Sequence, residues 1–141
     1  RRISHDMMPA TLSSFGLEDA IEDLVSDLLP STIHFEFNYS TDEEIENEKL
    51  KNHLYRITQE IVTNALKHSK PSMMTLEIKE TKGVLSYKYT DDSDGFQFDS
   101  NVAEDGIGLK GILTRIQLLN GSIVELPTGT SVYHFTIQNH R

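Results

Sequence analysis

The sequence feature that most constrains the fold is the run of residues 53–69, which contains neither glycine nor proline. On a helix that advances 100° per residue, its apolar side chains gather on one broad side. They are Leu54, Ile57, Ile61, Val62, Ala65 and Leu66. Arg56, Gln59 and Thr63 fall opposite, on the side expected to face water. The run therefore predicts a long amphipathic helix with one buried face.

A stripe of polar residues runs along the border between these two sides. At positions i, i+4, i+7 and i+8 it consists of Glu60, Asn64, Lys67 and His68. The Asn64 side-chain oxygen suits Mg²⁺, a hard cation that prefers oxygen ligands. Glu60 suits a water-mediated metal contact or a general base, and Lys67 and His68 suit phosphate oxygens. A solvated helix border explains the same stripe equally well, so both interpretations stay open.

Charge and composition limit the classes of partner. The chain has 141 residues and a formal net charge of −9. This charge argues against nucleic acid, because a protein that binds the phosphate backbone needs a basic surface. A single nucleotide is still compatible, since it can arrive with Mg²⁺ and be held by backbone N–H groups. No apolar run approaches the ~18 residues of a membrane span, so we expect no membrane contact.

Two further properties concern compartment and extent. The chain has no cysteine, which excludes disulfides and thiolate metal sites and fits a reducing, cytoplasmic compartment. It begins Arg-Arg-Ile-Ser, without an initiator methionine. We therefore expect a fragment of a longer protein, long enough for one domain and a short appendage.

Hydrophobic periodicity and turn residues predict the remaining elements. In order, they are a helical segment over 1–8 that ends before Pro9, a turn at 13–16, a helix at 17–29, a strand at 33–39, the central helix, strands at 73–80 and 84–90 joined by a hairpin turn at 81–83, a helix from about 106 to 119, and strands at 122–126 and 131–138. Helices and hairpins mix without a regular βαβ alternation. This order predicts an α+β fold, a two-layer α/β sandwich whose mixed, mostly antiparallel sheet is covered by helices on one face.

An acidic segment follows the strand at 84–90. A carboxylate at a strand end, such as Asp91, can accept the exocyclic amine of a purine, and Gly95 allows the backbone to approach a flat ring. An Asp-rich hairpin turn explains the segment as well. Asp91, Asp92 and Asp94 also raise the possibility of calcium, but the segment lacks the spacing and the closing Glu of an EF-hand.

Residues 106–111, Gly-Ile-Gly-Leu-Lys-Gly, stand where the next helix is expected to begin. Glycines there leave N–H groups accessible, and the helix dipole favours a phosphate. The segment is not a P-loop, which requires GxxxxGK[ST], and no βαβ unit surrounds it as a dinucleotide fingerprint requires. By itself it is weak evidence for a nucleotide.

Taken together, the three segments resemble the catalytic ATP-binding domain of bacterial sensor histidine kinases, which shares a Bergerat-type ATP-binding fold with DNA gyrase, the MutL repair proteins and the heat-shock chaperone ATPases. The matching motifs are Glu60-x-x-x-Asn64-Ala65-Leu66-Lys67-His68 for the N box, Asp91-x-Ser93-x-Gly95-Phe96 and Gly106-Ile107-Gly108-Leu109 for the two glycine boxes, and Gly129-Thr130 for the closing pair. The resemblance covers roughly residues 31–141. The Glu-x-x-x-Asn-Ala-x-x-His pattern and the short lid at 97–105 resemble the nitrate-sensor-like subfamily in particular.

The resemblance implies a role for each matching residue. Asn64 would coordinate Mg²⁺, Asp91 would bind the adenine amino group, and Glu60 would be metal-associated or the catalytic base. The remaining ATP-binding positions are Lys67 and His68 near the phosphates, Gly95, Gly106, Ile107, Gly108 and Leu109 around the pocket and lid, and Thr130 at the adenine site. The chain departs from the family in having Ser93 where Asp-x-Gly-x-Gly has its first glycine. A serine there is strained if it needs φ > 0, although its hydroxyl can hydrogen-bond locally.

The first residues of the chain predict a segment separate from the main domain. His5-Asp6 looks like a phosphoacceptor, but Pro9 would break the continuous helix that an acceptor needs. Residues 1–29 instead resemble the end of a dimerisation helix and its junction to the catalytic domain at 30–141. The phosphoacceptor would then lie upstream of Arg1, outside this chain.

The expected function is that of a kinase domain. The full protein would transfer the γ-phosphoryl group of Mg·ATP to a histidine outside this chain and then to an aspartate of a response regulator. We expect the parent protein to form a homodimer through helices upstream of Arg1. An anchor in a membrane is compatible with this chain but is not predicted by it. The main alternative is a degenerate nucleotide-binding domain that acts as a docking module. An ATPase that does conformational work is disfavoured by the short lid, and an anti-sigma-factor serine kinase by residues 1–29.

Overall fold

The computed structural model describes residues 9–93, 107–127 and 131–138. Its elements are α1 (Ala10–Phe15), α2 (Leu17–Leu28), β1 (His34–Thr41), α3 (Glu48–Asn64), the π-helical turn η1 (Ala65–Ser69), β2 (Met73–Thr81), β3 (Val84–Asp91), α5 (Ile107–Leu118), β4 (Ser122–Glu125) and β5 (Val132–Gln138). Among the described helices, none is both long and apolar enough to cross a membrane.

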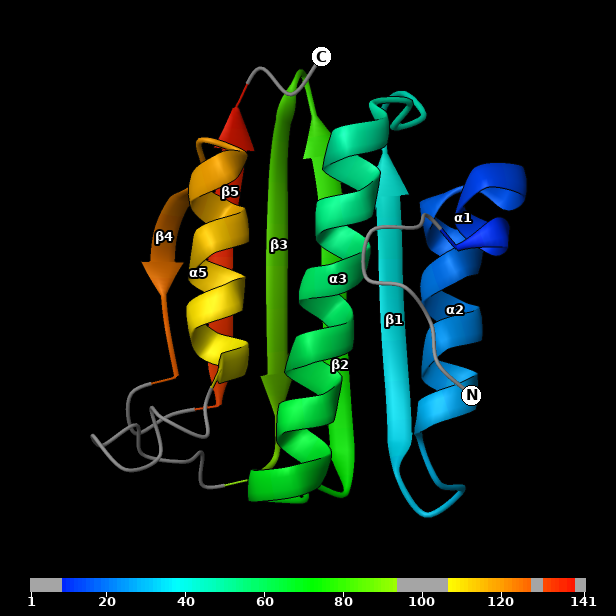
Figure 1. Ribbon diagram of the computed structural model, residues 1–141, viewed down its shortest axis with the longest axis vertical. Coiled ribbons are helices and arrows are strands. Elements are labelled where there is room, and N and C mark those ends of the chain that lie inside the picture. The colour runs from blue at the N-terminus through cyan, green and yellow to red at the C-terminus, as the bar shows by residue number, and fades with distance from the viewer. Residues whose placement is uncertain (1–8, 94–106, 128–130, 139–141) are drawn as a thin grey trace.

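The described strands form a single sheet with the order β1-β2-β3-β5-β4. The β1–β2 pair is parallel, and the other three pairs are antiparallel. Helices α3 and α5 lie side by side across one face of this sheet, and α2 lies beside α3 (Figure 1). The predicted α+β sandwich with a mixed, mostly antiparallel sheet is therefore confirmed.

The core lies between the sheet and its helices because strand residues alternate between buried and exposed positions. Tyr87 of β3 stacks on Phe135 of β5, with ring centroids 4.8 Å apart. The buried Tyr87 hydroxyl lies 2.7 Å from Thr58 Oγ1 of α3, so it keeps a hydrogen-bond partner in the apolar interior. Helix α3 begins where the Asn47 side chain accepts a hydrogen bond from the Leu50 N–H at 2.9 Å.

Two sequence predictions about the helices were wrong in detail. The predicted turn at 13–16 is reduced to Gly16, with φ +92°, because α1 continues to Phe15. Arg56 does not face water but is only 3% exposed. Its guanidinium lies 5.6 Å from the centre of the Tyr55 ring and donates to Gln59 at 3.0 Å, while α2 packs against α3.

A buried carboxylate holds the turns at the far end of β2. Glu80 is 1% exposed. Its Oε1 accepts the N–H groups of Asp42 at 2.9 Å and Glu43 at 3.1 Å, and its Oε2 accepts the N–H of Gly83 at 3.0 Å. Lys82 and Gly83 both have positive φ, 52° and 85°, as a two-residue hairpin turn requires. Glu80 thus joins the β2–β3 hairpin to the loop that follows β1.

Candidate functional site

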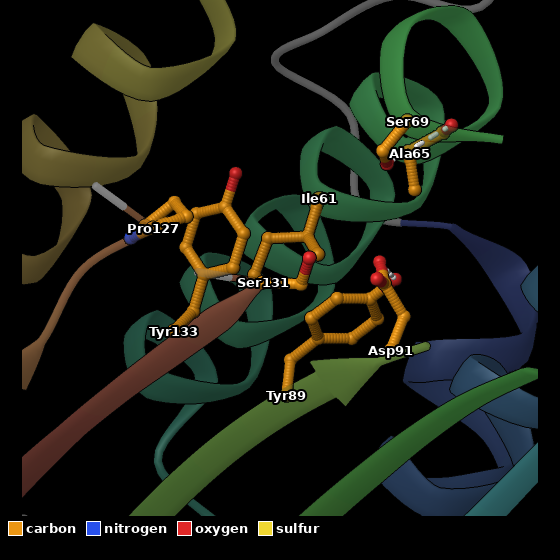
Figure 2. Close-up of a pocket in the computed structure, with 8 residues that line it drawn as sticks. All are labelled: Ile61, Ala65, Ser69, Tyr89, Asp91, Pro127, Ser131 and Tyr133. Carbon is orange, nitrogen blue, oxygen red and sulfur yellow. Dashed lines mark hydrogen bonds between the residues drawn. The ribbon is translucent and has the colours of Figure 1, made fainter. Parts of the chain in front are cut away.

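Four segments far apart in sequence meet at one end of the sheet. They are the end of β3, the end of α3 with η1, the start of α5 and the start of β5 (Figure 1). The pocket at this end of the sheet is lined by Ile61, Ala65, Ser69, Tyr89, Asp91, Pro127, Ser131 and Tyr133 (Figure 2). Its enclosed volume is about 10 Å³, room for about one water molecule.

The Asp91 carboxylate is the most highly hydrogen-bonded group in this pocket. Its Oδ2 accepts the Tyr89 hydroxyl at 2.7 Å, and its Oδ1 accepts both the N–H and the hydroxyl of Ser93, at 3.0 and 2.6 Å. Figure 2 shows the Tyr89 hydroxyl directed at the carboxylate. Burial, followed by the negative charge of Asp91, raises the pKa of Tyr89. Tyr89 therefore stays protonated and acts as a donor, which orients Asp91 at the end of the strand.

Asp92, which the sequence suggested only as a calcium ligand, connects the end of β3 to the start of β2. Its carboxylate accepts the Ser72 N–H at 2.9 Å, the Met73 N–H at 3.1 Å and the Ser72 hydroxyl. The Ser72 hydroxyl, followed by the Met73 N–H, holds the pKa of Asp92 below its ordinary value of 3.8. By fixing the strand end, Asp92 positions its neighbour Asp91.

Replacing Ser72 by alanine is expected to raise the pKa of Asp92 toward its ordinary value, because the strongest hydrogen bond to the ionised form is lost. A lowered folded-state pKa stabilises the protein above pH 3.8 and loses that contribution as the pH falls through the folded value. Acid unfolding of Ser72→Ala should therefore begin at higher pH. NMR titration of the Asp92 carboxyl carbon measures the shift, with Ser86→Ala as the control. An unchanged titration would contradict this account.

Asn64 and Tyr133 form the polar part of the opposite wall. Asn64 is 8% exposed, and its Nδ2 and the Tyr133 hydroxyl are buried with no well-formed hydrogen bond among the described residues, although the two groups are close enough for the amide to act on the hydroxyl. Burial raises the pKa of Tyr133 to about 12, with the Asn64 amide lowering it and the charges of Asp91 and Glu60 raising it. Buried polar groups without partners are costly. This wall is therefore suited to a ligand that supplies the missing hydrogen bonds.

Glu60 lies where α3 packs against α5. A Cβ placed on Gly111 would lie 2.7 Å from Glu60 Oε2, so glycine at 111 allows the carboxylate to sit against the second helix. Beyond this contact is a groove of about 380 Å³ lined by Glu60, Lys110, Gly111, Thr114, Arg115 and Leu118. Among the described residues, no group of three His, Cys, Asp or Glu side chains is arranged to hold a metal ion. Metal binding here would need oxygen atoms from the ligand.

The predicted polar stripe is divided by the π-helical turn. Glu60 and Asn64 lie on the regular part of α3, whereas Lys67 and His68 lie on η1 and are exposed. The turn closes through the Lys70 N–H, which donates to the Ala65 carbonyl at 2.7 Å, with Lys70 at φ +48°. Lys67 and His68 are therefore not among the pocket-lining residues.

The glycine-rich segments are described only in part. Ile107 and Gly108 belong to the first turn of α5 rather than to a loop, and the half-buried Leu109 packs against the core. Several predicted features lie outside the described residues, namely His5, Gly95, Gly106, Thr130 and the lid at 97–105. Sequence reasoning missed the walls formed by Tyr89 and Tyr133, which are cross-strand partners with ring centroids 5.9 Å apart. Their only sequence signal is the alternation of buried residues in two strands.

Comparison with known proteins places this geometry in context. No family model matches the chain. It is 32% identical over 129 residues to the Sensor protein VraS of Staphylococcus saprophyticus, covering 89% of this chain and 37% of that protein. The match to VraS of Staphylococcus haemolyticus is also 32%, over 133 residues, covering 89% and 36%. The chain thus spans a little over a third of the length of these curated relatives.

Solved structures show the same fold. The histidine kinase AdeS of Acinetobacter baumannii superposes with a TM-score of 0.63 at 16% identity, covering 89% of this chain and 62% of that chain. The catalytic domain of histidine kinase ThkA gives a TM-score of 0.62 at 15% identity and covers 90% and 97%. The fold of this chain is therefore that of histidine kinase catalytic domains.

Proposed function

We propose that this chain is the ATP-binding catalytic domain of a sensor histidine kinase, with residues 1–29 as its junction and 30–141 as the domain itself. The observation that carries the proposal is the pocket at the end of β3. There the oriented carboxylate of Asp91 and the ring of Tyr133 line one pocket, and the buried Asn64 is near enough to Tyr133 to lower the pKa of its hydroxyl. The similarity to VraS and the fold shared with histidine kinase catalytic domains support it.

In this proposal Asp91 accepts the adenine amine, and the Asn64 oxygen binds Mg²⁺ together with phosphate oxygens and water. The described residues fit that group, because Mg²⁺ in nucleotide sites takes few protein ligands and completes its shell with phosphates and waters. Glu60 is near enough to influence Tyr133 and would contact the metal through water or act as the base. Bound Mg²⁺ would neutralise phosphate charge. Because the enclosed space holds about one water molecule, the pocket has to widen before it can admit the adenine ring.

The proposed reaction is phosphoryl transfer from ATP to a histidine outside this chain, followed by relay to a response-regulator aspartate. Catalysis would consist mainly of positioning and charge neutralisation, with the exposed side chains of Lys67 and His68 directed to the phosphates as these extend past η1. The parent protein would dimerise through helices upstream of Arg1 and could be anchored to a membrane, with this domain in the cytoplasm. Membership of the nitrate-sensor-like subfamily rests on the pattern from Glu60 to His68.

A second candidate is a docking module that has lost nucleotide binding. The observation that favours it is the Ser93 hydroxyl, which occupies Asp91 Oδ1 at 2.6 Å, where the family has glycine. Calorimetry with an ATP analogue and Mg²⁺ separates the two candidates. Binding favours the kinase domain, whereas no binding at millimolar nucleotide favours the docking module.

Replacing Asn64 by alanine is expected to weaken Mg·ATP binding about tenfold, the usual effect of losing one interaction with a charged group. Binding of metal-free ATP should change little, because only the metal contact is removed. Titration calorimetry with Mg²⁺ and with EDTA measures the two affinities. Asn38→Ala, at an exposed position of β1, is the matched control. Mg·ATP binding that is untouched in Asn64→Ala would show that the proposed metal contact is wrong.

A further inference from the structure

A side-chain hydrogen bond joins two of the helices that cover the sheet. Helices α3 and α5 lie side by side (Figure 1). Arg115 of α5 contacts His53 of α3, with 3.0 Å between the Arg115 Nη1 and the His53 Nδ1. Both side chains are only partly buried, and the proposed phosphoryl transfer uses neither of them directly.

The chemistry of the two side chains fixes the protonation state of this pair. A guanidinium carries only donors, so Arg115 has to donate and the His53 Nδ1 has to accept. A protonated imidazole is a donor at both of its nitrogens. The hydrogen bond therefore exists only with neutral His53, in the tautomer that carries its proton on Nε2.

The surroundings of His53 favour this neutral form. Burial, followed by the positive charges of Arg115 and Lys49, lowers the pKa of His53 below its ordinary value of 6.5. Lys49 lies one turn earlier on α3 and Arg115 lies on α5, so each of the two helices presents a cation to the imidazole. Protonation of His53 would remove the hydrogen bond and replace it by repulsion between like charges.

The same two helices hold Glu60. It lies two turns beyond His53 on α3, and Gly111, against which its carboxylate sits, lies one turn before Arg115 on α5. The groove of about 380 Å³ runs beside both contacts, since Glu60, Lys110 and Arg115 all line it. It adds one carboxylate and one further cation to the charges near His53. Loss of the hydrogen bond is therefore expected to move α5 relative to Glu60.

We propose that His53 is a positioning residue for Glu60, on which it acts through Arg115 and α5. Neutral His53 holds α5 against α3, and protonated His53 releases it. The inference rests on the proposed function for the role of Glu60 and adds regulation of that site by pH. Because the folded-state pKa of His53 is lowered, the contact stabilises the fold fully above pH 6.5. That contribution is lost as the pH falls from there through the folded value.

NMR tests the contact itself. In the wild type, the Gly111 amide shift should titrate together with the His53 ring, apart from any step at more acidic pH from Glu60. His53→Gln keeps a side-chain acceptor for Arg115 but does not titrate, so the step should be absent. Arg115→Met removes the donor and its charge, so the pKa of His53 should rise toward 6.5. His34→Gln, at an exposed position of β1, is the matched control and should leave the Gly111 titration unchanged.

Hydrogen exchange and titration calorimetry test the consequence for the site. Each measurement is expressed as the ratio of wild type to His53→Gln, which cancels titrations that the two proteins share, including that of the nucleotide. Between about pH 8 and about pH 5, the exchange rate of the α5 amides should rise in this ratio by up to about tenfold, the effect of one hydrogen bond with a charged group. The ratio of Mg·ATP affinities should fall over the same range, by up to a similar factor.

Three results would overturn the inference. They are a Gly111 titration without a step at the pKa of His53, the same step in His53→Gln, and a pKa of His53 that is unchanged in Arg115→Met. If the wild type binds Mg·ATP and the affinity ratio does not change with pH, the positioning role of His53 fails while the proposed function stands. If neither protein binds nucleotide at any pH, the proposed function fails and the positioning role fails with it.

Discussion

Replacing Asp91 by alanine is expected to weaken ATP binding by about ten- to a hundredfold. A hydrogen bond to a charged group contributes about 1.5–3 kcal/mol, and each 1.4 kcal/mol changes affinity tenfold. The substitution removes the acceptor that we propose for the adenine amine and also the acceptor of the Tyr89 hydroxyl, which is 2.7 Å away. Titration calorimetry with ATP and with adenosine measures the loss. Both ligands should lose affinity by a similar factor, because the contact is to the base.

The matched control is Asp27→Ala, at an exposed position of α2, which should bind ATP as the wild type does. Circular dichroism of both variants separates lost binding from lost structure. If folded Asp91→Ala retained the wild-type affinity, adenine would not be recognised at the end of β3. The pocket would then have to be sought elsewhere on the fold.

Replacing Glu80 by alanine is expected to lower the free energy of unfolding by about 3 kcal/mol. Its buried carboxylate accepts three backbone N–H groups, from Asp42, Glu43 and Gly83, and each such bond contributes about 1 kcal/mol or more. Glutamine is also expected to destabilise, because its amide nitrogen cannot accept from an N–H where a carboxylate oxygen does. Urea denaturation followed by circular dichroism measures both changes.

Glu77→Gln provides the comparison for Glu80, since Glu77 is in the same strand and is only partly buried. It should change the free energy of unfolding by less than about 0.5 kcal/mol, as is usual for substitutions away from buried networks. Equal effects at the two positions would mean that the hydrogen bonds of Glu80 do not stabilise the turns. Because Glu80 is at the opposite end of β2 from Asp92 and its partners, nucleotide affinity of the folded variant should stay unchanged.

Local patterns in the sequence predicted the elements and the fold class, because alternation and helical periodicity report directly which face is buried. The same reasoning failed where a neighbour or a local irregularity changed the geometry. The helical wheel assigned Arg56 to water, but packing of α2 against α3 gives that helix a second covered side. The wheel also assumed 100° per residue up to His68, whereas the chain adopts a wider turn from Ala65 onward.

Single residues of the candidate site, namely Asp91, Asn64 and Glu60, were predictable from the sequence, but the contacts between residues were not. Asp91 could be located because a strand visibly ends there. Its hydrogen bonds could not be predicted, because the contact between Ser93 and Ser131 depends on how β3 pairs with β5. The close approach of Gly111 to Glu60 likewise depends on how two helices pack. Such pairwise geometry has no signature in a single sequence, so Tyr133 and Gly111 entered the site only with the structure.

The single parallel pairing in the sheet bears on the order in which the chain folds. The β2–β3 hairpin closes over two residues, whereas β1 can join β2 only after the whole of α3 has crossed between them. Closing the longer segment costs more chain entropy, and such non-local pairings form slowly. We therefore expect the sheet to grow outward from the hairpin. The aromatic side chains of β1, namely Phe35, Phe37 and Tyr39, would then be buried late in folding. Newly made chains would be most prone to aggregate before β1 joins the sheet.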